Sequence, residues 1–281
     1  MADKKIIIVA GPTASGKTDK SIELAKLYKA PIISADSRQI YIELNIGTAK
    51  PGPEVLQEVR HYFINHVSIV QNYDVGQYME EVSSLLDELF RVYDRVIVCG
   101  GSGLYIHSIL HGLDQFPPVD PQIRNHVRMI YESQGVVELQ KLVQEKDPQY
   151  FSNVDKENPR RLMRALEVCL ATNDAYSKFL QQPKAKKNYS FEKVFMHLER
   201  EQLYQRINLR VDQMIKAGLV DEVKSLTDFK MHQALNTVGY KEVFDYFDGM
   251  YSYEQMIEKI KQHTRNYAKR QMTWFRKYFV D

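Results

Sequence analysis

Cysteine is scarce in this sequence, and long apolar runs are missing. The 281 residues include two cysteines, Cys99 and Cys169, far apart and each within an apolar run. This argues against a disulfide framework and a cysteine metal site, and is typical of a protein in a reducing cytoplasm. No apolar run approaches the roughly 20 residues that a membrane helix needs, and residues 1–11 lead straight into an apolar strand without a signal-peptide pattern. We therefore expect a soluble cytoplasmic protein without a membrane partner.

The composition is typical of a folded protein, but the charge is unevenly distributed. Hydrophobic residues make up 44% of the chain and charged residues 26%, and a chain of this length can bury a sizeable core. The formal net charge is +2, yet residues 259–281 carry +6 and the preceding 258 residues carry −4. A basic block on an otherwise acidic chain indicates a polyanionic partner.

Short apolar strands alternate with amphipathic helices in the first hundred residues. Residues 6–10, 31–36 and 95–101 are apolar and typical of buried parallel strands. Segments 19–29 and 75–93 between them have apolar residues at helical spacing. The pattern predicts an α/β fold, a mainly parallel sheet flanked by helices, and residues 192–200 add a later strand.

The pattern changes after "HGLDQFPPVDP", residues 111–121. From about residue 122 to residue 182, helical periodicity and turn signals replace the strands. The stretch "QQPKAKKNYS", residues 181–190, then leads back to the strand pattern. We therefore predict a catalytic core from residues 1–112 and 191–281, and a helical insertion from residues 113–190.

Residues 11–18, "GPTASGKT", fit the phosphate-binding pattern G-x-x-x-x-G-K-[ST] between a strand and a helix. In such a loop the backbone N–H groups point inward, and the N-terminus of the following helix adds partial positive charge. Lys17 would reach the terminal phosphates, and Thr18 would offer its hydroxyl to Mg²⁺. The sequence thus predicts a pyrophosphate site but leaves open what is transferred. The expected contacts are Gly11, Pro12, Thr13, Ala14, Ser15, Gly16, Lys17 and Thr18.

The carboxylate expected nearest to the phosphates is that of Asp36. A nucleotide hydrolase or switch usually ends a later strand in Asp to help hold Mg²⁺, but the strand at 95–101 ends in Cys99 and two glycines. Asp36 follows the second strand, at the sheet edge where ligands of open α/β sheets bind. From the residues alone, Asp36 is a Mg²⁺ partner, a helix N-cap or a general base.

Eight segments, in order along nearly the whole chain, resemble the tRNA dimethylallyltransferases, also called tRNA isopentenylpyrophosphate transferases. They are "GPTASGKT", "ISADSRQIY", "IGTAKP", "GGSGLY", "NPRRLMRALEV", "LYQRINLRVDQMIKAGLVDEV", "TVGYKE" and "KRQMTWFRK". The resemblance implies a P-loop-kinase-like core whose loop holds dimethylallyl diphosphate. It also implies transfer of the prenyl group to N6 of adenosine 37, beside the anticodon of tRNA.

The resemblance assigns roles to particular residues. Asp36 takes the part of the general base, because an N6 amine is a poor nucleophile until its proton can leave. Thr13 matches a position whose hydroxyl contacts the oxygen between the prenyl carbon and the phosphate. Arg200 matches the arginine that clamps the pyrophosphate, although the residues alone favour a surface arginine at a helix start. Lys17, Thr18 and Mg²⁺ stabilise the charge on the departing pyrophosphate.

Basic residues in two later segments are candidates for RNA contact. Asn158 and Pro159 predict a helix N-terminus, with Arg160, Arg161 and Arg164 within one turn. This cluster is either a solvated face or an RNA contact, and the resemblance favours the contact. With the positions that the resemblance adds, the expected RNA contacts are Asp36, Ser37, Arg38, Gln39, Ser102, Arg124, Arg160, Arg161, Leu162, Met163, Arg164, Lys269, Arg270 and Arg276.

The last helix is expected to be amphipathic. Its basic residues, Lys261, Arg265, Lys269 and Arg276, lie roughly along one stripe, with apolar residues approximately opposite. Alternatively, the stripe is only a solvated face of the helix. We expect Trp274 and Tyr278 mostly in the core.

The chain departs from its relatives at a few positions. After "IGTAKP" the family usually has two histidines and then an aspartate; here His61 is kept, while Tyr62 and Asn65 differ, and Ser102 stands where threonine is common. The chain ends soon after "TWFRK", without the zinc finger of eukaryotic members, which indicates a bacterial-type enzyme, expected to be active and a monomer. The rival functions are a small-molecule P-loop kinase, an adenylate prenyltransferase and a non-catalytic RNA-binding protein.

Overall fold

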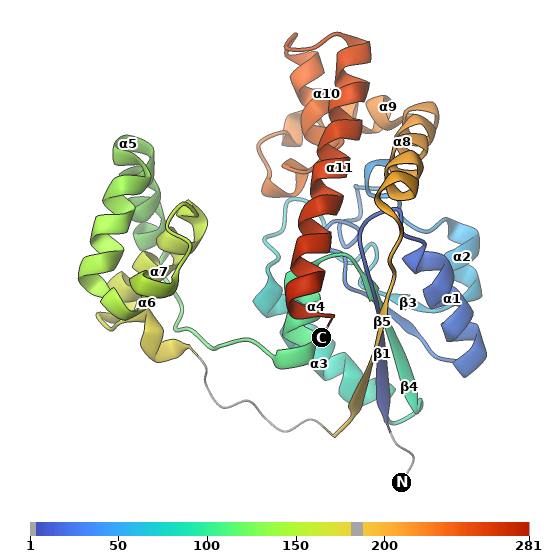
Figure 1. The fold of residues 1–281 in the computed structure, drawn as a ribbon, viewed down its shortest axis with the longest axis horizontal. Helices are drawn as coiled ribbons and strands as arrows, with labels where there is room; N and C mark the ends of the chain where they lie inside the picture. Colours follow the sequence, from blue (N-terminus) through green and yellow to red (C-terminus); the bar gives the residue numbers. More distant parts are fainter. Residues whose placement is uncertain (1–3, 181–187, 281) are drawn as a thin grey trace. The chain divides into compact units, whose positions relative to one another are not determined.

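The computed structural model describes residues 4–180 and 188–280. It divides into two compact units, one made of residues 1–112 and 186–281, the other of residues 113–185. We call them the core unit and the helical unit and describe each by itself (Figure 1).

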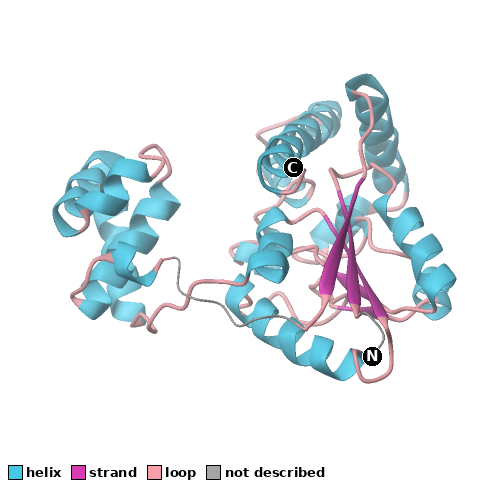
Figure 2. Cartoon of the chain, turned by 60° about the horizontal axis from the view of Figure 1, so that its bottom comes forward, coloured by secondary structure: helices cyan, strands magenta, loops and turns pink. Residues whose placement is uncertain are grey.

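The core unit is built on a five-stranded, all-parallel sheet with strand order β3-β2-β4-β1-β5. Its strands run through the middle of the unit with helices around them (Figure 2). The mainly parallel α/β sheet predicted from the sequence is therefore confirmed. The strands are β1 (Lys5–Ala10), β2 (Ile32–Ser34), β3 (His61–Tyr62), β4 (Arg95–Gly100) and β5 (Ser190–Phe195).

Side chains from β1 alternate between two hydrophobic layers. Ile6 and Ile8 belong to the larger cluster, with α3, α4 and the C-terminal helices, whereas Ile7 and Val9 pack with Leu24 of α1 on the opposite face. All four strand residues are fully buried, because helices cover both faces of the sheet. The helices of this unit are α1 (Lys17–Tyr28), α2 (Pro53–Glu58), α3 (Val75–Leu89), α4 (Gly103–His111), α8 (Arg200–Lys216), α9 (Leu219–Lys224), α10 (Tyr240–Phe247) and α11 (Tyr253–Tyr278).

The loops that follow β1, β2 and β4 meet at one edge of the sheet, because parallel strands all end there. These loops carry "GPTASGKT", Asp36 and "GGSGLY" respectively. The long C-terminal helix α11 packs against α4, α8 and α10, and its Phe275 is fully buried in the larger cluster. Short 3₁₀ turns complete the unit: η1 (Ile46–Thr48), η3 (Thr227–Phe229) and η4 (Gln233–Leu235).

The helical unit has a hydrophobic core of its own. Val127, Leu139 and Val143 of α5 pack against Leu162 and Leu166 of α7. The described residues of this unit contain no strand, as predicted. Its elements are α5 (Pro121–Lys146), which is broken at a glycine, α6 (Pro148–Asn153), α7 (Pro159–Thr172) and η2 (Tyr176–Phe179).

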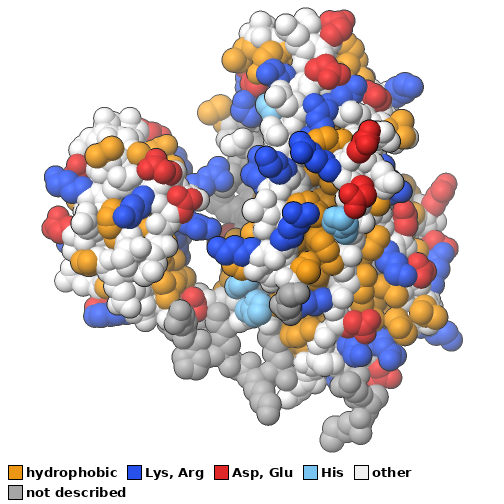
Figure 3. All heavy atoms as spheres, in the orientation of Figure 1, with side chains coloured by type: hydrophobic (Ala, Val, Ile, Leu, Met, Phe, Trp, Pro, Cys, Tyr) orange, Lys and Arg blue, Asp and Glu red, His pale blue; other side chains and the backbone are white. Residues whose placement is uncertain are grey.

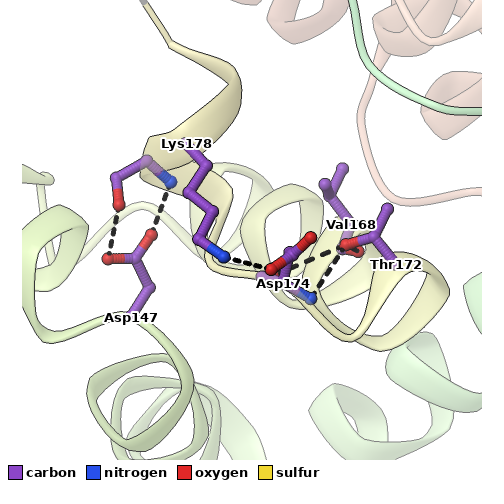
Figure 4. A network of polar contacts seen from close by, with 6 residues as sticks. Asp147, Val168, Thr172, Asp174 and Lys178 are labelled. Atoms are coloured by element: carbon purple, nitrogen blue, oxygen red, sulfur yellow. Dashed lines mark hydrogen bonds and ion pairs between the residues drawn. The ribbon is translucent and has the colours of Figure 1, made fainter.

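A buried carboxylate fastens η2 to the rest of the helical unit (Figure 4). Asp147 is 1% exposed and accepts hydrogen bonds from the backbone N–H of Ser177 (2.6 Å) and from its hydroxyl (3.0 Å). The same carboxylate caps α6 through the N–H of Tyr150 at 2.9 Å. A buried charge is tolerated when several donors bond to it. The Asp147 carboxylate therefore links α6 and η2 inside the helical unit.

Candidate active site

The phosphate loop lies between β1 and α1, as predicted. Gly16 has φ 88°, in the left-handed region, and caps the start of α1. A Cβ on Gly11 would lie 2.5 Å from the carbonyl oxygen of Met196. Any larger residue at this position would therefore clash with the backbone, and only glycine fits. Within this bend the buried hydroxyl oxygen of Ser15 has no hydrogen-bond partner. An orphaned buried hydroxyl just before the N-terminus of a helix fits an anion-binding site.

Lys17 is folded back onto the loop that it follows. Its Nζ donates a hydrogen bond of 2.6 Å to the carbonyl oxygen of Pro12. Burial lowers the pKa of this ammonium to about 8, the charge of Arg210 adds to the effect, and Asp36 partly opposes it. A lysine with so low a pKa gains from an anion beside it.

Arg210 of α8 is the arginine that reaches the loop. Its Nη1 donates a 3.4 Å hydrogen bond to the hydroxyl of Thr13, and burial lowers the pKa of its guanidinium. Nη1 of Arg206, one turn earlier, lies 3.7 Å from the position that a Cβ on Gly16 would occupy, so this side chain also reaches the loop. Sequence reasoning chose Arg200 and missed both.

Arg200 occupies a different place. It is exposed at the first position of α8, with its guanidinium over the ring of Tyr204. A helix rises about 1.5 Å per residue, so Arg210 lies about 15 Å further along the axis. This placement corrects our choice of arginine, because both belong to "REQLYQRINLR" and only the tertiary fold shows which turn meets the loop.

Asp36 follows β2 and is half-buried. Its Oδ1 accepts hydrogen bonds from the backbone N–H groups of Arg38 (2.8 Å) and Gln39 (3.2 Å). This resembles the predicted N-cap, except that residues 37–40 form turns rather than an α-helix. Because both bonds use Oδ1, Oδ2 remains for another partner. The charge of Asp36 acts on Lys17 on one side and on Tyr267 of α11 on the other.

A pocket of about 570 Å³ opens within the core unit, next to Ser37 and Arg38, the two residues that follow Asp36. Four predicted RNA contacts line it: Ser37, Arg38, Ser102 and Arg270. Ser102 helps to shape it, because its Oγ accepts from the N–H of Ser37 at 2.9 Å and lies 3.2 Å from the Ser37 hydroxyl. Sequence reasoning missed the aromatic part of the lining, which comprises Tyr41, Tyr73, Tyr105, Tyr267, Trp274 and Phe275.

Three aromatic residues of α11, Tyr267, Trp274 and Tyr278, lie in different surroundings. Trp274 is half-buried: it packs against the larger core cluster, as expected, and also lines the pocket. A Cβ on Gly103 would lie 2.4 Å from its indole. Tyr278 is 40% exposed, so it is not a core residue. Burial, and after it the charge of Asp36, raises the pKa of Tyr267, which therefore keeps its proton as a hydrogen-bond donor to the pocket.

Gln271 of α11 joins the phosphate loop to the pocket wall. Its Oε1 accepts a 2.9 Å hydrogen bond from the backbone N–H of Thr13, and its Nε2 donates a 2.8 Å bond to the carbonyl oxygen of Gly101. The side chain is 7% exposed. It sits in the quoted segment "KRQMTWFRK", but nothing in the sequence shows that its amide spans two distant loops.

The predicted basic stripe on α11 is only partly available. Lys261 pairs with Asp212 of α8 at 2.9 Å, and Arg265 donates a 2.7 Å hydrogen bond to Asn208, so these two hold α11 to α8. Lys and Arg side chains gather on the face of the core unit where α11 lies (Figure 3). The predicted contacts that remain exposed on this helix are Lys269, Arg270 and Arg276.

The helical unit carries the other predicted RNA contacts. Arg160 and Arg161 are exposed at the start of α7, where Asn158 is the N-cap and Pro159 the first helical residue, as predicted. Leu162 is fully buried in the core of the unit. Helical periodicity turns its side chain inward, so the side chain is not available to RNA, and contact at this position stays a prediction for the backbone alone.

Three further predicted contacts of the helical unit lie in different environments. Arg124 is exposed in the first turn of α5. Met163 is half-buried and packs on the core of the unit. Nη1 of Arg164 lies 3.5 Å from Oε2 of Glu167, and its guanidinium lies over the ring of Phe116. RNA contact by these residues stays a prediction.

The part of the chain that the structure describes holds neither a cluster of metal-binding side chains nor a membrane-spanning helix. Residues 4–180 and 188–280 contain no group of three or more His, Cys, Asp or Glu side chains that could hold a metal ion. No helix within those ranges combines the length and the apolarity needed to cross a membrane. Both cysteines, Cys99 and Cys169, are free.

Comparison with known proteins agrees with this geometry. The family model described as IPP transferase matches residues 39–278. A tRNA dimethylallyltransferase of Christiangramia forsetii is 46% identical over 272 residues, covering 97% of this chain and 90% of that protein. Another from Flavobacterium johnsoniae is 44% identical, covering 98% and 91%.

Solved structures of such enzymes have the same fold. A tRNA isopentenylpyrophosphate transferase from Bacillus halodurans has a TM-score of 0.70 and 34% identity, covering 99% of this chain and 88% of that one. A eukaryotic dimethylallyltransferase acting on tRNA has a TM-score of 0.83 and 25% identity, covering 97% and 70%. Matched in sequence and fold over nearly its whole length, the chain belongs to the IPP transferase family, the tRNA dimethylallyltransferases.

Proposed function

We propose that the protein transfers a dimethylallyl group from dimethylallyl diphosphate to N6 of adenosine 37 in tRNA, releasing pyrophosphate. The observation that carries this is the position of Asp36. Its charge acts on Lys17 of the phosphate loop and on Tyr267, and Tyr267 lines a pocket together with Ser37 and Arg38, the residues that follow Asp36, in a chain of this enzyme family. A diphosphate and an acceptor base would thus meet beside one carboxylate.

The loop side would bind the donor. The N–H groups of residues 16–18 at the start of α1 and the Ser15 hydroxyl would offer hydrogen bonds to the diphosphate. Lys17 would exchange its bond to Pro12 for a phosphate oxygen, and Arg210 would turn from Thr13 to the same group. Thr13 would then bond the bridging oxygen. These groups stabilise the charge that develops on the departing pyrophosphate.

Mg²⁺ fits this site only together with the diphosphate. The exposed Thr18 side chain at the start of α1 would supply one ligand, and phosphate oxygens and waters would complete the octahedron that Mg²⁺ requires. When bound, the ion neutralises part of the diphosphate charge.

The pocket side would bind the acceptor. Adenine N6 is hidden in a stacked loop, so the base has to be flipped out to react. The aromatic lining offers stacking surfaces for the flipped base. As N6 bonds to the prenyl carbon, the carbon–oxygen bond to the diphosphate breaks and pyrophosphate leaves. The N6 proton then passes to the carboxylate of Asp36.

The exposed basic residues would hold the rest of the tRNA. Lys269, Arg270 and Arg276 on α11 suit RNA phosphates. We assign the helical unit, through Arg160 and Arg161, to the anticodon stem-loop. A tRNA substrate places the enzyme in the cytoplasm, and one core unit carries both halves of the site, so a monomer suffices.

Mass spectrometry of tRNA nucleosides, after incubation of unmodified tRNA with dimethylallyl diphosphate and Mg²⁺, tests the proposal. We expect a prenylated adenosine at position 37 of the tRNA. Prenylation of AMP in preference to tRNA would favour an adenylate prenyltransferase, and consumption of ATP with no use of the prenyl donor would favour a kinase. Asp36→Asn should abolish transfer and spare tRNA binding, whereas a non-catalytic RNA-binding protein would show no transfer even as the wild type.

A further inference from the structure

A carboxylate outside the site gathers four hydrogen bonds at the start of η1. Oε2 of Glu222, on α9, accepts from the backbone N–H groups of Asn45 (3.2 Å) and Ile46 (2.8 Å). Oε1 accepts from the N–H of Gly47 (3.1 Å) and from the hydroxyl of Tyr240 (2.6 Å). The carboxylate thus caps the unpaired N–H groups that begin a 3₁₀ turn, where negative charge is favoured.

Packing makes this arrangement rigid. Tyr240 is fully buried, and a Cβ on Gly47 would lie 2.4 Å from its ring. Burial, and after it the bond to Glu222, raises the pKa of Tyr240, so the phenol keeps the proton that it donates. The turn is therefore held by a ring on one side and by a carboxylate at its end.

The other end of η1 leads to the reacting groups. The carbonyl oxygens of Thr48 and Ala49 accept hydrogen bonds from Nε2 of Gln39, at 3.1 and 3.2 Å. The backbone N–H of Gln39 in turn donates to Oδ1 of Asp36 at 3.2 Å. The path from Glu222 to Asp36 therefore consists of one 3₁₀ turn, one glutamine side chain and hydrogen bonds.

We propose that Glu222 is a positioning residue for the tRNA-modifying reaction. Through η1 and Gln39 it fixes the turn at residues 36–39, and so the orientation of the Asp36 carboxylate toward the acceptor. This rests on the proposed role of Asp36 as the base. Glu222 acts only through other residues: the backbone of residues 45–49 and the Gln39 side chain transmit its effect.

The donor side is held by other contacts. The phosphate loop is tied to Gln271 and lies against Met196, and neither residue belongs to the path from Glu222. Loss of the Glu222 contacts should therefore loosen the acceptor side selectively. A general loss of stability, in contrast, would reduce the active fraction and affect both substrates alike.

The test is Glu222→Gln in the full-length chain, compared with Asp221→Asn. The amide keeps the size of Glu222, but one oxygen becomes an NH₂ group that faces a backbone N–H donor. Asp221 is exposed on the same helix, so its substitution removes the same charge without touching η1. The measurements are the Kd for dimethylallyl diphosphate, kcat and KM for tRNA, and hydrogen exchange of the peptides that cover residues 36–49.

For Glu222→Gln we expect kcat/KM for tRNA to fall by about ten- to a hundredfold, since misplacement by an ångström can cost about that much. Exchange at residues 36–49 should rise, and the donor Kd should stay within about twofold of wild type; Asp221→Asn should change none of these. Equal losses for donor and tRNA, or unchanged turnover, would overturn the inference. Wild-type protein without transferase activity would instead refute the proposed function.

A second variant covers the case in which Glu222→Gln does not fold. Tyr240→Phe removes one of the four donors and leaves the three backbone bonds to the carboxylate. We expect a smaller loss in the same tRNA parameter, again with normal donor binding. If this variant folds and modifies tRNA like the wild type, the inference fails.

Discussion

The side-chain oxygen of Gln271 accepts a 2.9 Å hydrogen bond from the backbone N–H of Thr13, 258 residues away in the chain. The same amide donates to the carbonyl oxygen of Gly101. One buried side chain of α11 therefore sets the spacing between the phosphate loop and the wall of the acceptor pocket. The shape of the site depends on the last helix as much as on the loops.

Replacing Gln271 by Met should disturb both loops with little change in volume. Each lost partner leaves a buried backbone group unpaired, at about 1–3 kcal/mol. We expect a lower Tm and a lower kcat, together with weaker donor binding, because the Thr13 N–H loses its fixed direction. Calorimetry with dimethylallyl diphosphate measures donor binding, single-turnover transfer measures the rate, and thermal unfolding gives the Tm. Normal donor affinity in a folded variant would contradict the role of this contact.

Arg210 and Arg200 form a matched pair on one helix. Arg210→Ala should weaken donor binding by about ten- to a hundredfold, because hydrogen bonds to charged groups contribute about 1.5–3 kcal/mol. Arg200→Ala removes the same charge from an exposed position and should change donor affinity by less than about twofold. Titration of both variants with the prenyl diphosphate decides between them. A larger effect at Arg200 would restore the assignment made from the sequence.

The pH dependence of donor binding should follow Lys17, whose pKa is about 8 in the free protein. A bound diphosphate favours the charged ammonium and raises that pKa. Affinity is therefore full below pH 8 and falls as the pH rises above 8. Near pH 8, binding should take up a fraction of a proton, which calorimetry in buffers of different ionisation enthalpy detects. Lys17→Arg stays charged and should lose this dependence; a flat wild-type profile to pH 9.5 would rule the explanation out.

The exposed cations of α11 should make tRNA binding sensitive to salt. For single-stranded nucleic acid, the slope of log K against log salt is about −0.7 per neutralised phosphate. Lys269→Ala should weaken tRNA binding and reduce this slope, with little effect on donor binding. Lys261→Ala is the contrasting variant: its ion pair with Asp212 links α11 to α8, so we expect mainly a lower Tm. An unchanged slope for Lys269→Ala would identify a solvated face.

Asn65 stands where the family usually has aspartate, and its side chain accepts a 2.6 Å hydrogen bond from Lys50. Burial lowers the pKa of Lys50 to about 8, partly opposed by Glu222 and Glu43. Between about pH 8 and 10 the unfolded chain binds this proton and the folded chain does not, so stability is lost as pH falls through that window. Asn65→Asp should raise this pKa and the Tm, most at pH 7 and least near pH 10. An equal gain at both pH values would point to another cause.

Local sequence patterns predicted the elements that carry their own signals. Apolar runs marked three of the strands, residues 192–200 indicated a fourth, and the phosphate loop follows from eight consecutive residues. Strand β3 has only two residues, His61 and Tyr62, which is too short for a period-two pattern. Asn158 was recognisable as an N-cap because capping is a local interaction.

Residues whose roles depend on tertiary contacts were not predictable in the same way. Arg210 and Gln271 meet Thr13 across the chain, and no spacing within α8 or α11 encodes that meeting. Trp274 was expected mostly in the core and does pack against it, but its place in the pocket lining depends on the close approach that Gly103 allows. Leu162 was carried along with its arginine neighbours, although its helical position faces the core.

The pairing of β1 with β5 has a consequence for the order of assembly during synthesis. Lys5 is paired with Ser190 in the sheet. One edge of β1 therefore stays unpaired until β5, synthesised 185 residues later, is available. At about 5–20 residues per second, that delay is about 10–40 s. Residues 113–185, with their own core and the Asp147 anchor, emerge within this interval and can close first. The catalytic sheet is therefore completed only after the helical unit has left the ribosome, and α11, which carries Gln271, is added last.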